Sequence, residues 1–336
     1  MVLGEDSHEE AASAPAPAAV AAGAGADGAS SCESSPSTIE GLLLRHIIKH
    51  ASDGCAKMAD WRPMLNRRNS GIPRIMGVLN LTPDSFHADS RVDSLELAVE
   101  RARRMVDDGA DWIDIGAEST RPGASPVDPE EEEGRAIPAV EAVREAIPDV
   151  CISIDTRRAS VAAAALDAGA DMVNDVSALS DSLMAGLVAQ RGCPICIMHM
   201  QGLPENMQDD PAYRDIVTEV RGALEVAATS LFEAGVDPNV VMADPGIGFG
   251  KRLEHNLALL SAGRSVVPDE RMPLLWGVSR KSMFHHLLGR ENTSDRLAGS
   301  LGIAARAIDL GVDVIRVHDV AEHADLYSAM NALEVG

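Results

Sequence analysis

The sequence predicts an α/β protein, a (β/α)8 TIM barrel that follows a disordered N-terminal extension. Three observations favour this fold over its competitor, a doubly wound open sheet. Short apolar runs of strand type alternate with stretches of helical period, and eight strand-type runs follow residue 74. These units occupy about 260 residues, the size typical of such a barrel. Polar side chains stand at the end of every strand, where a parallel barrel would gather them on one face.

The predicted strands are almost continuously apolar, as expected for a parallel sheet that is buried on both faces. In chain order they cover residues 74–79, 112–116, 151–155, 171–175, 194–199, 239–244, 274–278 and 313–318. Each is therefore expected to lie between the barrel interior and a layer of helices.

The segments between most strands are rich in Ala, Leu, Glu and Arg at helical spacing, as in residues 94–110 and 160–170. The acid-rich segment 128–135 is interpreted as the first turn of a helix that a proline opens. Several helices are expected to end at a glycine in the left-handed conformation, just before the next strand. These glycines are Gly109, Gly169, Gly235 and Gly311.

The N-terminal region divides into two predicted segments. Residues 1–38 consist largely of Ala, Ser, Gly, Pro and acids, and such a segment cannot bury enough apolar surface to fold, which predicts a disordered acidic tail. Residues 39–71 are predicted to form a helix, capped by Ser37 or Thr38, and a linker. The barrel itself is expected over residues 72–336.

Charge and composition limit the possible partners. The 336 residues include 29 Lys and Arg against 52 Asp and Glu, a net charge of −23, which argues against binding nucleic acid or an anionic membrane. A small anionic ligand stays possible, because a local basic pocket can coexist with an acidic surface. The first ten residues do not resemble a signal peptide, and no apolar stretch is long enough to span a membrane. Five cysteines do not make a disulfide framework, so we expect a soluble, reduced, cytoplasmic protein.

The residues at the strand ends divide by charge. Asp155, Asn174 and Asp244 end strands directly and would lie deep in the mouth of the barrel, where carboxylate oxygens can accept two N–H donors from a planar heterocycle. The cationic and donor residues at the other strand ends suit a phosphate or a diphosphate. They are Asn80, Arg121, Arg280, Lys281, Arg316 and His318. We therefore expect a donor-rich ring bound deep in the mouth, with an anion near the rim.

Several of these features also have a purely structural interpretation. Asp155 or Asp244 alone could cap the helix that follows its strand. His199 lies between two methionines on an alternating strand, and a structural role in the helix layer is favoured over a catalytic one. The glycine spacing of residues 244–251 matches neither of the two common phosphate-binding motifs. The cysteine pair in residues 193–196 has redox spacing but runs into a strand, which favours buried thiols.

Eight segments follow one another along the barrel: "MGVLNLTPDSF", "DIGAESTRPGA", "SIDT", "VND", "MHMQG", "DPGIGFGK", "GVSRKS" and "RVHD". In these motifs and in their order, the chain resembles the dihydropteroate synthase family over about residues 72–334. The resemblance implies a (β/α)8 barrel, commonly dimeric, that acts in folate synthesis and is the target of sulfonamides. It implies that 4-aminobenzoate is joined to the pyrophosphate ester of 6-hydroxymethyl-7,8-dihydropterin, with Mg2+ as cofactor and pyrophosphate as the second product.

The resemblance also implies a role for each matching residue. The pterin would be bound by Asp155, Asn174, Asp244 and Lys281, with Met198 lining its pocket. The pyrophosphate would be held by Asn80, Arg316 and His318, with Asn80 near the metal. The aminobenzoate site would be shaped by Phe249, Lys281 and Ser282. The loop after the first strand and the loop with Thr120, Arg121 and Pro122 would close over the substrates. The catalytic residues would be Asn80, Asp155, Lys281, Arg316 and His318.

Residues 87–90 depart from the family's pattern, which commonly has Ser-Asp-Gly-Gly where this chain has His-Ala-Asp-Ser. Our hypothesis is that Asp89, displaced by one position, supplies the missing acid. Asp89→Ala should then lower kcat/KM strongly. The alternative is that the loop works without this acid or that activity is reduced. An unchanged kcat/KM in the Asp89→Ala variant would reject the Asp89 hypothesis.

Three rival functions remain open at this stage. A methyltetrahydrofolate-binding barrel would hand a methyl group to a corrinoid, but "STRPG" and "SRKS" favour the synthase, because a methyl carrier has no diphosphate to hold. A paralogue that binds pterin without turnover is the second rival. The third is a Schiff-base aldolase that uses Lys281, and the neighbouring Arg280 and the acids argue against it.

Overall fold

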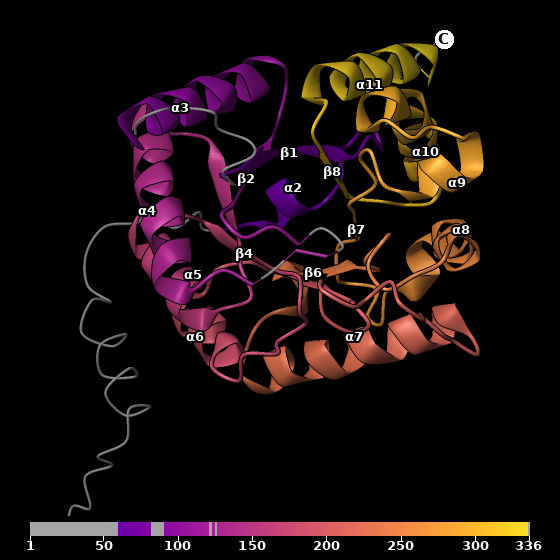
Figure 1. The fold of residues 1–336 in the computed structure, drawn as a ribbon, viewed down its shortest axis with the longest axis horizontal. Helices are drawn as coiled ribbons and strands as arrows, with labels where there is room; N and C mark the ends of the chain where they lie inside the picture. Colours follow the sequence, from indigo (N-terminus) through magenta and orange to yellow (C-terminus); the bar gives the residue numbers. More distant parts are fainter. Residues whose placement is uncertain (1–59, 82–90, 121–122, 125, 335–336) are drawn as a thin grey trace, which may run out of the picture. The chain divides into compact units, whose positions relative to one another are not determined.

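The computed structural model describes residues 60–81, 91–120, 123–124 and 126–334 (Figure 1). The predicted tail over 1–38, the predicted N-terminal helix and the altered loop at 87–90 lie outside the described residues. The domain boundaries drawn from the sequence therefore stay predictions. Within the described part of the chain, none of the helices has the length and apolar character needed to cross a membrane.

Eight parallel strands form one sheet in the order β6-β5-β4-β3-β2-β1-β8-β7. They are β1 Arg74–Asn80, β2 Trp112–Gly116, β3 Cys151–Asp155, β4 Met172–Asp175, β5 Ile195–Met198, β6 Val241–Asp244, β7 Leu275–Trp276 and β8 Val314–Val317. The two end strands meet where Ala243 pairs with Leu274, so the sheet curves into a nearly closed barrel. Every predicted strand is confirmed, although β7 is shorter than its apolar run, and the open-sheet alternative is wrong.

Helices follow every strand and surround the sheet (Figure 1). They are α2 Arg62–Leu65, α3 Arg91–Asp107, α4 Pro129–Ala146, α5 Ala159–Asp167, α6 Met184–Arg191, α7 Ile216–Glu233, α8 Leu253–Ala262, α9 Met283–Leu288, α10 Leu297–Asp309 and α11 Val320–Glu334, with short 3-10 turns η2 Pro238–Val240, η3 Gly263–Val266 and η4 Thr293–Arg296. The predicted proline start of α4 is confirmed, and Asp128 caps it by accepting the Glu130 N–H at 2.9 Å. All four predicted cap glycines have positive φ.

The strands bury two different faces. Outward side chains such as Ile115, Ile152 and Ile315 pack against the helices in the main core. Inward side chains at the N-terminal ends of the strands form a second apolar cluster, the barrel floor: Trp61, Leu65, Met76, Trp112, Cys151, Met172, Cys196, Met242, Leu275 and Val314. Trp61 and Leu65 come from α2 and the residue before it, so a part of the predicted linker packs into the floor.

A repeated aspartate stabilises this N-terminal end of the barrel. Asp111, Asp171 and Asp313 each stand just before an even-numbered strand and accept the backbone N–H of a neighbouring strand segment, at Ile75, Ile152 and Leu274, each at 2.8 Å. Each carboxylate also pairs with arginine, from Arg68 and Arg74, Arg144 and Arg264 respectively. These ion pairs therefore stabilise the barrel floor, and the residues predicted to bind ligands lie at the opposite end, where the strands have their C-terminal ends.

Candidate active site

A cavity of about 430 Å³ opens at the C-terminal ends of the strands. Its walls come from β1, the ends of β3 and β8, η4, and the loops after β2, β5, β6 and β7. Nine of the residues predicted from the sequence line it: Asn80, Thr120, Asp155, Phe249, Arg280, Lys281, Ser282, Arg316 and His318. Arg121 and Pro122 lie outside the described residues. The expectation that the strand ends gather on one face is confirmed, because a parallel barrel brings all of them there.

Asn174, Met198 and Asp244 do not line this cavity and are buried at the ends of β4, β5 and β6. Met198 and Asp244 are direct neighbours on paired strands. Neither predicted acid caps the following helix: Asp155 pairs with Arg316, and Asp244 accepts the Gly246 N–H at 2.7 Å, far before α8 begins. The capping alternative is therefore wrong for both carboxylates.

An acid that sequence reasoning missed lies at the bottom of the site. Asp114 is fully buried in the middle of β2, and its Oδ2 accepts from Arg316 Nε at 2.6 Å and from Asn174 Nδ2 at 3.2 Å. Arg316 Nη2 donates to Asp155 Oδ2 at 2.7 Å. The signal that could have identified Asp114 is in "WIDIG", where a charged residue interrupts an apolar strand at an inward position before the strand ends.

Burial governs the charges of this group. It raises the pKa of Asp155 to about 7, although Arg316 acts in the opposite direction. Burial also disfavours the Arg316 cation, but Asp114 and Asp155 outweigh it and raise the pKa of Arg316. The arginine is therefore a permanent cation whose direction is set by two carboxylates.

Lys281 brings the second cation to the cavity wall. Its Nζ lies 4.1 Å from the centre of the Phe249 ring, and burial lowers its pKa to about 8. The preceding residue, Arg280, has a φ of 55°, a strained conformation for a non-glycine residue. Its N–H donates to Ser300 Oγ at 2.9 Å and its Nε pairs with Asp319 Oδ2 at 2.9 Å, and these contacts hold the turn that aims Lys281 inward.

His318 is placed as a neutral donor. Burial lowers its pKa to about 4, and the Arg316 charge adds to this effect. Its backbone N–H donates to Ser279 Oγ at 3.1 Å, and its Nδ1 lies 3.0 Å from the same oxygen. The Ser279 hydroxyl can then donate to Nδ1, which leaves the ring proton on Nε2, where it can bind an anion in the cavity.

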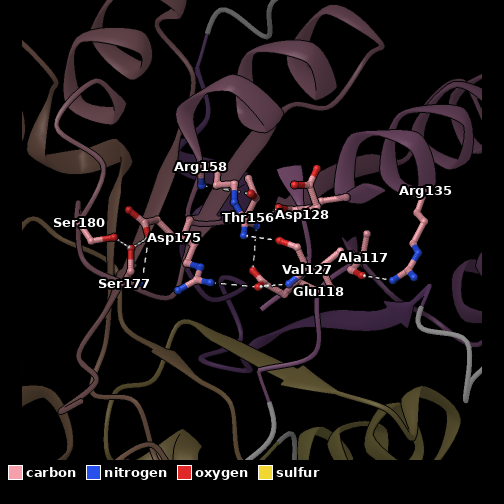
Figure 2. A network of polar contacts seen from close by, with 12 residues as sticks. Ala117, Glu118, Val127, Asp128, Arg135, Thr156, Arg158, Asp175, Ser177 and Ser180 are labelled. Carbon is pink, nitrogen blue, oxygen red and sulfur yellow. Dashed lines mark hydrogen bonds and ion pairs between the residues drawn. The ribbon is translucent and has the colours of Figure 1, made fainter. Parts of the chain in front are cut away.

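A polar network fixes the start of the loop after β2 (Figure 2). Glu118, which lines the cavity, accepts the Val127 N–H at 3.0 Å and pairs with Arg157 and Arg158, each at 3.0 Å. Arg158 also donates to the Val127 carbonyl at 2.6 Å and pairs with Glu132, a buried residue of the first turn of α4. The acid-rich turn predicted as a simple helix start therefore also anchors one wall of the site.

His199 and the cysteine pair have structural surroundings. The His199 ring lies 6.0 Å from the Tyr213 ring, its Nδ1 contacts Lys251, and it does not line the cavity. This agrees with the structural interpretation of the histidine. Cys193 and Cys196 are both buried and are not joined in a disulfide, so the interpretation of the pair as buried thiols is confirmed.

The pterin-binding enzyme family matches residues 76–318 of this chain. That range begins in β1 and ends just after β8, so it covers most of β1, the other seven strands and every wall of the cavity. Fold and site together define a pterin-binding barrel.

Similar proteins show which pterin-binding enzyme this barrel resembles. The dihydropteroate synthase of Neisseria meningitidis serogroup C is 44% identical over 267 residues, which cover 78% of this chain and 93% of the relative. A dihydropteroate synthase structure from Xanthomonas albilineans with 4-aminobenzoic acid has a TM-score of 0.73 at 38% identity, covering 80% of this chain and 95% of that one. One from Burkholderia cenocepacia with 7,8-dihydropteroate has a TM-score of 0.70 at 42% identity, covering 78% and 92%. The chain belongs to the dihydropteroate synthase family and is a transferase of folate biosynthesis.

Proposed function

We propose that this barrel condenses 6-hydroxymethyl-7,8-dihydropterin pyrophosphate with 4-aminobenzoate to give 7,8-dihydropteroate and pyrophosphate. One observation carries the proposal: a single cavity is lined by Asp155, Lys281, Arg316 and His318, and the buried Asp114 pairs with Arg316. Such a site offers acceptors for a donor-rich ring and donors for a diphosphate. The product and the aminobenzoate found in the two related structures are the ligands that this arrangement would take.

The pterin would enter between the acids and amide of the strand ends. Asp155 and Asp244 would accept its ring N–H and amino protons, and Asn174 would complete the set with Lys281. Met198 would pack against the ring face. The low polarity around these buried groups strengthens each hydrogen bond to the ligand.

The chemical step breaks a bond between a methylene carbon and a pyrophosphate oxygen. The electron-rich pterin stabilises positive charge on that carbon, and the acids below it would add to this effect. Arg316 and the Nε2–H of His318 would bind the leaving pyrophosphate. The aromatic amine is already nucleophilic, so it requires positioning between Phe249 and Ser282 more than activation. Sulfonamides, as analogues of the aminobenzoate, would compete there.

The donor set suits a magnesium ion that arrives with the substrate. Among the described residues no cluster of three His, Cys, Asp or Glu side chains could hold a metal, but Asn80 lines the cavity and has a side-chain amide oxygen. Mg2+ typically takes one or two protein ligands and completes its shell with phosphate oxygens and water. Asn80 and the diphosphate would hold the ion, which would neutralise charge on the leaving group. Chelation with EDTA should abolish turnover, and added Mg2+ should restore it.

The direct test mixes the purified protein with the pterin pyrophosphate, labelled 4-aminobenzoate and Mg2+, and measures labelled dihydropteroate. The synthase activity is supported if the wild-type protein forms this product and the His318→Ala and Arg316→Met variants do not. Pterin binding without product would instead support the paralogue that only binds. A methyl transfer from methyltetrahydrofolate to a corrinoid would overturn the proposal.

A cytoplasmic homodimer is the proposed state of the protein. Leu257 of α8 and Leu287 and Leu288 of α9 are exposed on neighbouring helices, and a second copy could cover them. Light scattering after size exclusion would measure the mass in solution. A monomer at assay concentration would contradict this part of the proposal.

A further inference from the structure

The loop of residues 245–252, between β6 and α8, packs tightly against the loop that follows β5. Gly246 and Gly250 have φ values of 68° and 59°, and a Cβ on either would overlap the carbonyl oxygen of His199 or Gln201. Tyr213 Oη donates to the Gly250 carbonyl at 2.8 Å from the other side. The two loops are therefore in backbone contact, and their relative position leaves little freedom.

Lys251 fills the junction between these loops. Its residue is 3% exposed, and its Nζ contacts His199 Nδ1 at 2.9 Å, the His199 carbonyl at 3.1 Å and the Phe249 carbonyl at 2.9 Å. Three acceptors match the three N–H donors of an ammonium group. The side chain therefore connects the end of β5, which carries Met198, to the segment that carries Phe249.

Lysine chemistry at this position is distinctive within the described part of the chain. Arginine is the cation of the ion pairs between side chains in this part of the chain, for example Arg144 with Asp171 and Arg264 with Asp313. The described residues contain only two lysines, Lys251 and Lys281, and both stand beside this pocket wall. An ammonium is compact and can direct three donors to a pyramid of acceptors, whereas a guanidinium is a planar fork. The junction thus uses geometry that arginine does not offer.

The hydrogen bond from Lys251 is made to a residue of the cavity wall, Phe249. Gly248 and Phe249 line the cavity, and the Phe249 ring faces the Lys281 ammonium at 4.1 Å. Because Lys251 holds the Phe249 carbonyl, it sets the position from which that ring projects. Gln208 Nε2 donates to the Gly248 carbonyl at 2.8 Å, but this bond is exposed and competes with water.

We propose that Lys251 is a positioning residue for the aminobenzoate subsite: it ties Phe249 to His199 and so orients the Phe249 ring against Lys281. The inference rests on the proposed function. Lys251 does not line the cavity, so it acts through Phe249 and touches neither substrate. Loss of this hydrogen-bonded link displaces the ring on the aminobenzoate side and leaves in place the part of the pterin side that Asp155 and Asn174 form.

The test compares three variants with the wild-type protein. Lys251→Met removes all three donors at similar volume, and Lys251→Arg keeps the charge but changes the geometry. The matched control is Arg144→Met, because Arg144 also donates to carbonyls, those of Pro148, Val150 and Gly169, but at the floor end of the barrel. KM for each substrate, pterin affinity by calorimetry and the melting temperature are measured for each.

Both Lys251 variants should raise the KM for 4-aminobenzoate about tenfold or more and leave pterin affinity within about twofold, since a displacement near an ångström is costly where groups are pre-positioned. Arg144→Met should lower the melting temperature without this split. Equal effects on both substrates, or an unchanged aminobenzoate KM, would overturn the inference. If Lys251→Met does not fold, Lys251→Arg decides alone. If the wild-type protein shows no turnover, the proposed function fails instead, and the inference is judged by calorimetric binding of 4-aminobenzoate.

Discussion

Replacement of Asp114 by asparagine tests the buried acid–arginine group most directly. Asn keeps an oxygen that can accept from Asn174, so the change removes mainly the negative charge beside Arg316. The Asp114 side chain is 0% exposed and that of Arg316 is 20% exposed, so the pair lies largely out of water. Removing one partner of a buried ion pair costs about 3–5 kcal/mol, because the other charge stays buried.

The lower end of that range applies here. Arg316 keeps its second carboxylate, Asp155, at 2.7 Å, and its partial exposure lets water reach part of the guanidinium. We therefore expect Asp114→Asn to lower the free energy of unfolding by about 3 kcal/mol. At about 2–4 °C for each kcal/mol in a protein of this size, the melting temperature should fall by about 6–12 °C.

Thermal unfolding followed by circular dichroism measures this change, and a double-mutant cycle identifies its cause. In Asp114→Asn combined with Arg316→Met, the unpaired cation is gone, so the double variant should be more stable than the sum of the single changes predicts. The reasoning would be refuted if the effects of the two single changes were additive, or if Asp114→Asn lowered the melting temperature by less than about 2 °C. kcat/KM should also fall in this variant, because Arg316 loses one of the two groups that direct it.

Three further predictions follow from other parts of the molecule. The pKa of Lys281 is lowered to about 8, so its side chain is a cation below that pH and neutral above it, and kcat/KM should fall as pH rises through this value. Lys281→Arg should move this fall in kcat/KM to higher pH. A fall at the same pH in Lys281→Arg would contradict its assignment to Lys281. A chain shortened to begin at residue 60 should keep its melting temperature. A chain that begins at residue 70 loses Trp61 and Leu65 from the floor, which should lower the free energy of unfolding by about 5 kcal/mol or more. Equal melting temperatures of the two shortened chains would show that the floor does not need these side chains. The net charge of −23 means that the excess acidic side chains repel one another at low salt, so NaCl at about 0.15 M, which shortens the Debye length to about 8 Å, should raise the melting temperature. An unchanged or lower melting temperature would mean that neighbouring cations already compensate the acids.

The sequence determined the repeating part of this protein. Strands 112–116 and 151–155 were predicted to the residue, and the helix caps at Gly109 and Gly311 were found, because period, branching and glycine placement are set by local backbone geometry. The parallel topology then placed the strand-end residues together, since all such ends share one face. Asn80, Asp155, Lys281 and His318 could therefore be assigned to one cavity before their contacts were known.

The tertiary structure decided which groups support that cavity from behind. Asp114 pairs with Arg316 across 202 positions of the chain, and Lys251 lies 52 positions from the histidine that it contacts. Such partners meet only when the barrel closes, and no local period records them. The same is true of the segment around α2, which the sequence predicts as a linker although Trp61 and Leu65 pack into the barrel floor. The reason is physical: local backbone geometry selects elements, whereas burial and charge pairing act between elements and depend on how the whole barrel packs.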